Sequence, residues 1–412
     1  MRNNLYRANR RLSAAALAVL LVPGVTLGAT PFAQCLARLK AEAVHGGISP
    51  ATADAVLATV HERPRVISAD RNQPEFVETL ADYLQSHVSS GRVERGRDLL
   101  HRYAPLLARL EAQYGVPPQY LVAFWGLETD YGRVLGDVPV FDSLATLACD
   151  TRRGDYFAGE FVNALEIADR GIPSETMTGS WAGAMGHTQF MPSVYLADAV
   201  DGDGDGVVDL WRSVPDAFAS AANFLRSLGW KRGWRWGREV QLPAAFDYYQ
   251  AGLDHSKSLA DWRRAGVRAA DGRLIEAYDE PASLLLPAGQ KGPAFLVYAN
   301  FRTIMRWNHS ELFALAAARL ADRIAGSGPL HRPPPDQPKL SRVDVEAVQR
   351  ALAARGFPSG EPDGIAGPAT RRAVRDWQRT HRKVADGYIG VELLDSLGIK
   401  EMSDEQQAGT RR

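Results

Sequence analysis

The stretch FWGLETDYG, residues 124–132, decides the fold, because it sets one acid into a run of apolar residues. The apolar spacing predicts a helix over 117–130, in which Glu128 shares a face with Phe124 and Trp125. Hydrocarbon surroundings disfavour an ionised carboxylate, so a carboxyl group in such a place can hold its proton near neutral pH. This is what a general acid requires.

Asp130 is not expected to be the partner of Glu128, because two residues along a helix are about 200° apart around the axis. The alternative to a catalytic role is a structural glutamate at a helix end, bonded to nearby backbone.

Two further signals follow Glu128 along the chain. The first is a Gly/Ser-rich loop, GSWAGAMGHTQFMPS, at 179–193, and the second is the acidic run DGDGDG at 201–206. A glycosidase with two carboxylates needs its second acid about 5 to 9.5 Å from the first, and the sequence indicates none beside Glu128. The three signals in this order therefore predict an enzyme that cleaves a glycan with a single acid.

Length and composition describe a folded protein with room for two or three domains. The chain has 412 residues, of which 45% are hydrophobic, and its 48 Lys and Arg balance 48 Asp and Glu. With no net field to attract polyanions, nucleic acid and anionic membrane surfaces are not expected as partners.

Residues 1–28 have the pattern of an export signal. Four arginines precede the apolar run 12–21, and small residues follow, with cleavage expected near Gly28 or Ala29. The run is short for a membrane span, so we expect no stable membrane anchor and a soluble periplasmic protein. In an oxidising compartment, Cys35 and Cys149 are expected to form one disulfide, the alternative being two buried thiols.

The order of elements predicts a mainly α protein of the α+β class. Helices are expected at 35–43, 74–85, 92–114, 117–129, 156–169, 216–228, 295–306 and 310–324, and short strands at 239–242 and 284–286. The domain prediction is a catalytic domain at 29–325, a Pro-rich linker at 326–340, a small helical domain at 341–400 and a disordered tail at 401–412.

Five ordered motifs carry a specific resemblance over about 31–324. FWGLETDYG, LATLACDTRRGDYF, GSWAGAMGHTQFMPS, DGDGDGVVDLW and RWNHS together resemble the membrane-bound lytic murein transglycosylase B family. The resemblance implies a lysozyme-like helical domain that cleaves the bond from N-acetylmuramic acid to N-acetylglucosamine in peptidoglycan, for cell-wall remodelling or turnover.

The resemblance also implies the chemistry. Glu128 matches the family's single catalytic glutamate, which protonates the glycosidic oxygen and then deprotonates the 6-hydroxyl of the sugar, leaving a 1,6-anhydromuramic end. A hydrolytic muramidase, which would leave a reducing end, and a non-catalytic wall-binding scaffold are the rival hypotheses.

Several residues match family positions that contact substrate: Ser180, Gln189, Asn308, Trp307, Arg152 and Arg153. Ser180 could instead be a turn or cap residue, and the two arginines could be a solvated charge pair. Trp307 stands where a tyrosine is usual, and Phe224 where some relatives have one. Glycines 179, 183 and 186 are expected to let the backbone approach the glycan closely.

The acidic run follows the start of an EF-hand loop, whose oxygen ligands suit calcium. Asp201, Asp203 and Asp205 occupy ligand positions, but the twelfth position is an arginine, where an EF-hand has glutamate. The resemblance implies that Asp216 closes the loop and that the Val207 carbonyl contributes. Asp216 could instead cap a helix together with Ser213, from capping-box spacing. We expect a structural Ca²⁺ ion here.

Residues 341–400 resemble a three-helix peptidoglycan-binding domain. VEAVQRALAARGF, DGIAGPATRRAVRDWQRTH and DGYIGVELLDSLG predict three amphipathic helices separated by Asp-Gly turns. The predicted core is Val348, Leu352, Val374, Trp377 and Leu394.

Two groups of aromatic residues remain. The tryptophans at 230, 234 and 236 could form a sugar-stacking platform, although core or lid packing is the favoured role. His187 is singled out among the histidines because it lies inside the glycine-rich loop.

Overall fold

A computed structural model describes residues 30–71 and 78–399. The predicted export signal, the tail predicted to be disordered and the first residues of the helix expected at 74–85 lie outside the described residues.

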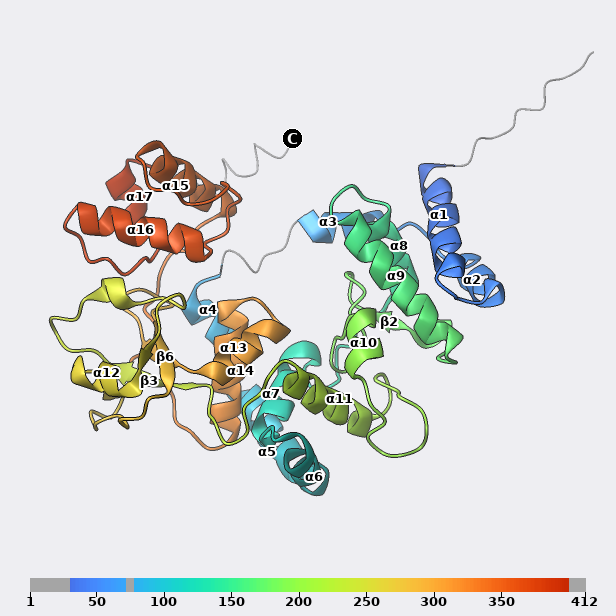
Figure 1. The fold of residues 1–412 in the computed structure, drawn as a ribbon, viewed down its shortest axis with the longest axis horizontal. Coiled ribbons are helices and arrows are strands. Elements are labelled where there is room, and N and C mark those ends of the chain that lie inside the picture. Colours follow the sequence, from blue (N-terminus) through green and yellow to red (C-terminus); the bar gives the residue numbers. More distant parts are fainter. Residues whose placement is uncertain (1–29, 72–77, 400–412) are drawn as a thin grey trace, which may run out of the picture.

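Helices dominate the chain (Figure 1). The helices before the main sheet are α1 Pro31–His45, α2 Pro50–Leu57, α3 Pro64–Arg71, α4 Leu80–His87, α5 Ser90–Arg102, α6 Ala104–Tyr114, α7 Pro118–Thr129, α8 Val140–Ala148, α9 Gly154–Asp169, α10 Pro192–Asp198 and α11 Val214–Ser227. The later helices are α12 Leu259–Arg264, α13 Ala299–Trp307, α14 Glu311–Ile324, α15 Arg342–Ala354, α16 Pro368–Thr380 and α17 Val391–Leu397.

The helix expected over 92–114 is in fact two. The helix α5 ends at Arg102, and α6 begins at Ala104 with a proline in its first turn. Proline lacks an N–H and its ring crowds the preceding turn, so a continuous helix through this point is disfavoured.

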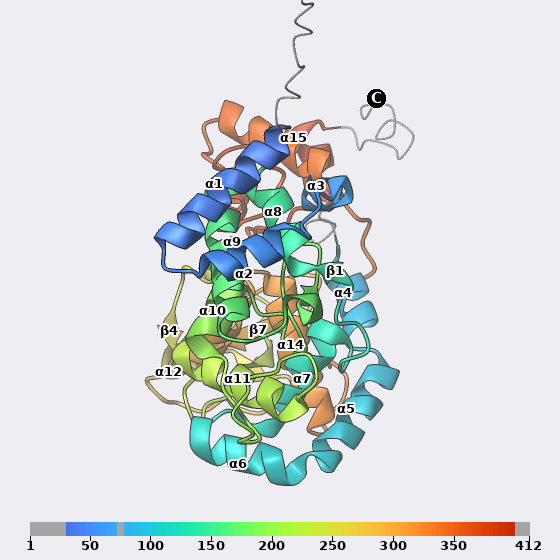
Figure 2. The same ribbon diagram turned by 90° about the vertical axis from the view of Figure 1, so that its right-hand side faces the viewer.

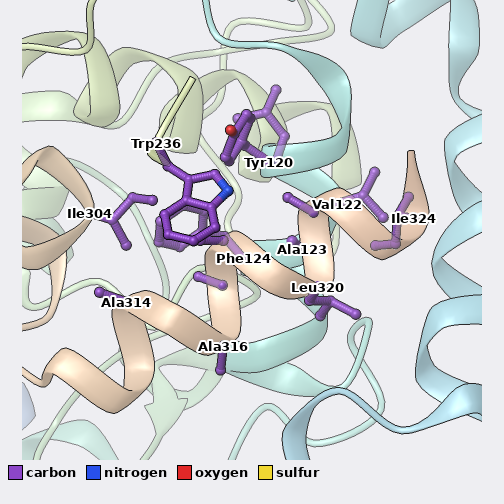
Figure 3. Packing of buried hydrophobic residues seen from close by; sticks show 14 of the residues in the cluster. Tyr120, Val122, Ala123, Phe124, Trp236, Ile304, Ala314, Ala316, Leu320 and Ile324 are labelled. Atoms are coloured by element: carbon purple, nitrogen blue, oxygen red, sulfur yellow. The ribbon is translucent and has the colours of Figure 1, made fainter. Parts of the chain in front are cut away.

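Helix α7 lies at the centre of the largest core. Seven consecutive residues from Tyr120 to Gly126 are buried, so the helix is covered on every side. Figure 3 shows its side chains packed against α14, whose alanines at 314 and 316 let the two helices come close, and against Trp236. Because Glu128 lies in the last turn of α7, this core fixes its position.

A second core supports the first half of the chain. Helices α8, α9 and α10 pack together, and α1 and α2 cross over α9 (Figure 2). The disulfide expected between Cys35 and Cys149 is present and ties α1 to the end of α8.

Two antiparallel sheets complete the fold. The smaller pairs β1 Val138–Pro139 with β2 Thr178–Gly179. The larger has the order β4-β6-β7-β3-β5, with β3 Gly237–Gln241, β4 Lys257–Ser258, β5 Arg268–Ala269, β6 Pro281–Leu285 and β7 Ala294–Val297. The helix expected from residue 295 was wrong at its start, because 294–297 form the buried strand β7 and the helix begins only at Ala299. Short apolar runs fit a strand and a buried helix equally well.

Two of the three tryptophans near 230 confirm core packing. Trp236 is fully buried in the largest core and Trp230 is nearly so, while Trp234 is about one third exposed. They therefore do not present a joint platform of exposed ring faces.

Residues 326–340 carry no helix or strand, and α15 to α17 then form a compact unit around the five predicted core residues. This three-helix module docks on the sheet region (Figure 1). Asp254 forms ion pairs with Arg372 and Arg375, and the Tyr249 hydroxyl donates a hydrogen bond to Asp376 at 2.8 Å. The module is therefore held against its neighbour by directed polar contacts.

Candidate active site

Glu128 is half-buried at the C-terminal end of α7. The helix ends at Thr129, and the cap residue after it, Asp130, takes the left-handed conformation with φ 51°. The indole Nε1 of Trp307, the last residue of α13, donates a hydrogen bond to Glu128 Oε1 at 2.8 Å. One carboxylate oxygen is thus held in place by a group 179 residues further along the chain.

Trp307 is itself held by three phenylalanine rings. Its ring centroid lies 4.5 Å from that of Phe124, 5.1 Å from Phe224 and 5.5 Å from Phe190. These rings come from α7, α11 and the glycine-rich loop, so three elements fix the orientation of the donor. Phe224 acts here through packing, which needs no hydroxyl group.

A small cavity lies beside Glu128. Its walls are apolar side chains of α7 and α11, closed by Trp307 and Thr188. The Thr188 hydroxyl is buried and has no hydrogen-bond partner among the described residues, which makes it a polar group available at this cavity. Sequence reasoning did not single out Thr188, and the only signal for it was its place next to Gln189 in the loop.

The glycine-rich loop folds back on itself. Ser180 Oγ accepts from the backbone N–H groups of Ala182 and Ala184, in the manner of a turn residue. Gln189 has φ 50°, and its amide nitrogen donates to the carbonyl oxygens of Leu135 and Gly186. Both side chains therefore have structural partners besides any substrate they contact.

The glycines of this loop are required by the chain itself. A Cβ atom on Gly179 would lie 2.0 Å from the Ala184 carbonyl oxygen, and one on Gly186 would lie 2.5 Å from the Leu210 carbonyl oxygen. The expected close approach to a glycan is not needed to explain them, because the backbone segments already leave no room for a side chain.

His187 connects the loop to α7. Its Nδ1 accepts from the Trp125 indole at 3.0 Å, and its backbone carbonyl accepts from the Thr129 hydroxyl at 3.1 Å. Burial lowers the pKa of His187, against the opposing effect of Asp209. Because Nδ1 accepts a hydrogen bond, the neutral ring carries its proton on Nε2.

The remaining predicted substrate residues lie at helix ends. Asn308 is the cap residue that follows α13, directly after Trp307, and its Oδ1 accepts from the Ser310 N–H at 3.0 Å. Arg152 and Arg153 both pair with the carboxylate of Asp70 on α3, whose side chain is buried while theirs are about half exposed. The pair is thus part of an ion-pair network that joins α9 to α3.

The acidic loop brings three carboxylates together at the surface. Oxygen atoms of Asp201, Asp203 and Asp205 all lie within 4.8 Å of one another, and the three residues are exposed. Hydrogen bonds from the backbone N–H groups of Gly206 and Gly204 lower the pKa of Asp201. Ionised carboxylate oxygens at this spacing fit a hard divalent cation such as Ca²⁺.

Asp216 differs from those three residues. It is buried, and its two oxygens accept from the backbone N–H groups of Gly202 and Asp209 at 2.8 and 2.7 Å. Its own N–H donates to Ser213 Oγ, which caps α11. Burial is the largest cause of its raised pKa. Asp216 therefore ties the two ends of the acidic loop to α11 and lies outside the group of three.

Fold and site together define a class of protein. A helical body holds one carboxylate by an indole N–H, beside a cavity and a glycine-rich loop. A carboxylate placed in this way can act as the single acid of an enzyme that cleaves a glycosidic bond.

Comparison with known families gives the same assignment. Residues 31–322 match the model of the transglycosylase SLT domain, and 341–397 match that of a peptidoglycan binding domain. The chain belongs to the transglycosylase SLT domain family.

Individual relatives agree with this. Membrane-bound lytic murein transglycosylase B of Escherichia coli K12 is 34% identical over 249 residues, which are 59% of this chain and 66% of that protein. The crystal structure of SltB3 from Pseudomonas aeruginosa in complex with NAG-anhNAM-pentapeptide is 43% identical, with a TM-score of 0.86, covering 89% of this chain and 99% of that one. E. coli lytic transglycosylase Slt35 in complex with calcium has a TM-score of 0.62 at 31% identity, covering 71% of this chain and 94% of that one.

Proposed function

We propose that this protein is a lytic transglycosylase that cleaves the β-1,4 bond between N-acetylmuramic acid and N-acetylglucosamine in peptidoglycan, with Glu128 as its only acid and base. The observation that carries the proposal is the half-buried Glu128 carboxylate, held at 2.8 Å by Trp307 in a chain of the transglycosylase family.

The proposed reaction consumes no water. Glu128 gives its proton to the glycosidic oxygen, and the bond from that oxygen to the anomeric carbon breaks while the N-acetyl oxygen of the muramic acid assists at that carbon. The 6-hydroxyl of the same sugar then attacks the anomeric carbon, and its proton returns to Glu128. The products are a free 4-hydroxyl on one strand and a 1,6-anhydro ring on the other.

The substrate class follows from the relatives and from the second domain. SltB3 was crystallised with NAG-anhNAM-pentapeptide and with NAG-NAM-pentapeptide, and 341–397 match a peptidoglycan binding domain. Ser180, Gln189, Trp307, Asn308, Arg152 and Arg153 are the residues proposed to contact the strand.

The reaction can be tested by analysing the products that the enzyme releases from purified cell-wall sacculi. Mass spectrometry should find muropeptides that are lighter by one water than hydrolysis products and that resist borohydride reduction. If reducing ends dominate instead, the enzyme is a muramidase and the proposed step at the 6-hydroxyl is wrong.

A Ca²⁺ ion bound by Asp201, Asp203 and Asp205 is proposed as a structural brace, with the Val207 carbonyl and Asp216 as additional candidates. The exposed cluster of three carboxylates and the calcium in the Slt35 structure support the ion. When bound, it would neutralise the mutual repulsion of the carboxylates and stiffen the loop before α11.

The periplasm is the proposed location, from the export pattern in 1–28 and from the substrate. Among the residues that the structure describes, none of the helices combines the length and apolar character of a membrane span.

A further inference from the structure

A cleft of about 670 Å³ lies where the catalytic domain, the linker and the C-terminal module meet. Its walls come from residues 288–291 after β6, from residues 335–338, and from the stretch between the end of α16 and Ser396 of α17. Pockets of roughly 300 to 1,000 Å³ hold small ligands. None of its lining residues belongs to the cavity beside Glu128, so it is a separate site.

Contacts across the cleft fix its shape. The Gln290 N–H donates to Asp386 at 2.9 Å, the Tyr388 hydroxyl donates to Gln337 at 2.8 Å, and Lys291 forms an ion pair with Glu392. The first and third contacts join the module to the catalytic domain, and the second joins the module to the linker. The cleft therefore exists only when all three segments are in place.

Trp377 supplies a hydrogen-bond donor to this cleft. The residue lines it and is only 3% exposed, and its Nε1 has no hydrogen-bond partner among the described residues. A buried donor without a partner is uncommon in folded proteins. One face of the ring is covered by His381 at a centroid distance of 4.3 Å. Because the ring is almost fully buried, it has no open face for a sugar, and its buried N–H at the cleft wall is the group that a carbonyl or carboxylate oxygen could meet.

The rim of the cleft carries exposed charges of both signs. Lys383 and Arg382 are cationic, and Glu392 and Asp336 are anionic. Lys383 also donates to Ser396 at 2.9 Å, which holds its ammonium group near the C-terminal end of α17. A ligand with carboxylates, an amine and amide carbonyls matches this lining better than a neutral sugar does.

We propose that this cleft binds the peptide stem of peptidoglycan, with a stem carbonyl or carboxylate accepting from Trp377 Nε1 and a stem carboxylate paired with Lys383. The pentapeptide in the ligands of the SltB3 structures belongs to this chemical class. The inference rests on the proposed function, because it takes its ligand from the same polymer. Recognition of the wall then requires the docked catalytic domain as well as the module.

The experiment is calorimetric titration of the full chain carrying Glu128→Gln with a synthetic stem pentapeptide that has no sugar. The Glu128→Gln background prevents turnover. We expect binding that weakens about tenfold or more in Kd with Lys383→Ala, and likewise with Trp377→Phe, which removes the N–H and keeps a smaller aromatic ring. The control is Arg350→Ala, an exposed cation of the same module outside the cleft, which should leave Kd unchanged.

Lys383 is exposed, so Lys383→Ala is not expected to disturb folding. It therefore still tests the cleft if Trp377→Phe proves unstable. Absence of pentapeptide binding, unchanged affinity with Lys383→Ala, or displacement of the pentapeptide by peptide-free glycan strands would each overturn the proposal. Products of the wild-type enzyme on peptide-free glycan strands report on the proposed reaction alone. A failure of the cleft and a failure of the reaction are therefore distinguished.

Discussion

The end of helix α7 and the acidic loop at 201–205 use carboxylates in opposite surroundings. Glu128 is half-buried and receives an indole N–H, with an apolar cavity beside it. Asp201, Asp203 and Asp205 are exposed and lie within 4.8 Å of one another. The first setting suits a group that exchanges one proton with a substrate, and the second suits a group that shares one cation. The surroundings, and not the residue type, separate the two roles.

Of the substitutions considered, a change at Glu128 should have the largest effect on activity. Glu128→Gln keeps the shape of the side chain but removes the transferable proton, and general acid-base catalysis contributes roughly 10² to 10⁴ in rate. Release of anhydromuropeptides from sacculi should fall by at least this factor, because one group serves both steps.

The matched control is Glu94→Gln on α5, where the glutamate is exposed. It should retain wild-type activity. Substantial activity in Glu128→Gln would mean that another acid acts and that the resemblance assigned the wrong residue.

The acidic loop should respond to a cation. A ligand that binds only the folded state at about 100 times its Kd stabilises it by roughly 2.7 kcal/mol, so Ca²⁺ should raise Tm and EDTA should reverse the rise. The double variant Asp203→Ala with Asp205→Ala should lose this response while Glu128 chemistry persists.

Asp271→Ala with Asp279→Ala removes two other carboxylates of the sheet region and should keep the calcium response. An identical rise in Tm in the loop variant and the wild type would place calcium elsewhere in the chain.

Trp307→Phe tests how the half-buried Glu128 carboxylate is held. The substitution keeps an aromatic ring among Phe124, Phe190 and Phe224 but removes the donor to Glu128. A hydrogen bond to a charged group is worth about 1.5 to 3 kcal/mol. We therefore expect kcat to fall by roughly 10- to 100-fold in Trp307→Phe.

Phe224→Leu alters the packing around the same indole without removing its N–H, and it should have a smaller effect on kcat than Trp307→Phe. The reverse order would show that ring packing matters more than the hydrogen bond.

His187 lies between the two regions. Its substitution should have the smallest effect of those considered, a change in the pH dependence of Tm. It accepts from Trp125 of α7, and its backbone N–H donates to Leu210, which follows the acidic loop. Burial lowers its pKa in the folded state, while an unfolded histidine titrates near about 6.5. The unfolded state therefore takes up the proton first, so this contribution to stability is present above about pH 6.5 and is lost as the pH falls below it.

Melting curves from pH 5 to 8 check this dependence. His187→Gln should flatten the fall in Tm at the acid end, whereas His101→Gln, an exposed histidine on α5, should not. Equal pH dependence in the wild type and His187→Gln would show that His187 does not control it.

Much of the fold was predictable because local patterns and tertiary packing agree. Helices with clear apolar spacing, such as α9, α11 and α14, appear where they were expected, and the five core residues of the C-terminal module are all buried. The prediction failed at 294–297, where an apolar run of four residues forms β7. Hydrogen bonds to β6 and to β3, which lies more than 50 residues earlier in the chain, decide that choice.

The sequence by itself determined that one glutamate lies on a buried helix, that three aspartates alternate with glycines, and that the chain resembles a transglycosylase joined to a small helical module. Such features depend on residue type and short spacing. Only the tertiary structure decided that Trp307 donates to Glu128, that Arg152 and Arg153 pair with Asp70, and that the module closes a cleft against residues 288–291. Each of these contacts joins residues about 80 to 180 positions apart, and the direction of a side chain across such a distance is set by the packing of whole helices.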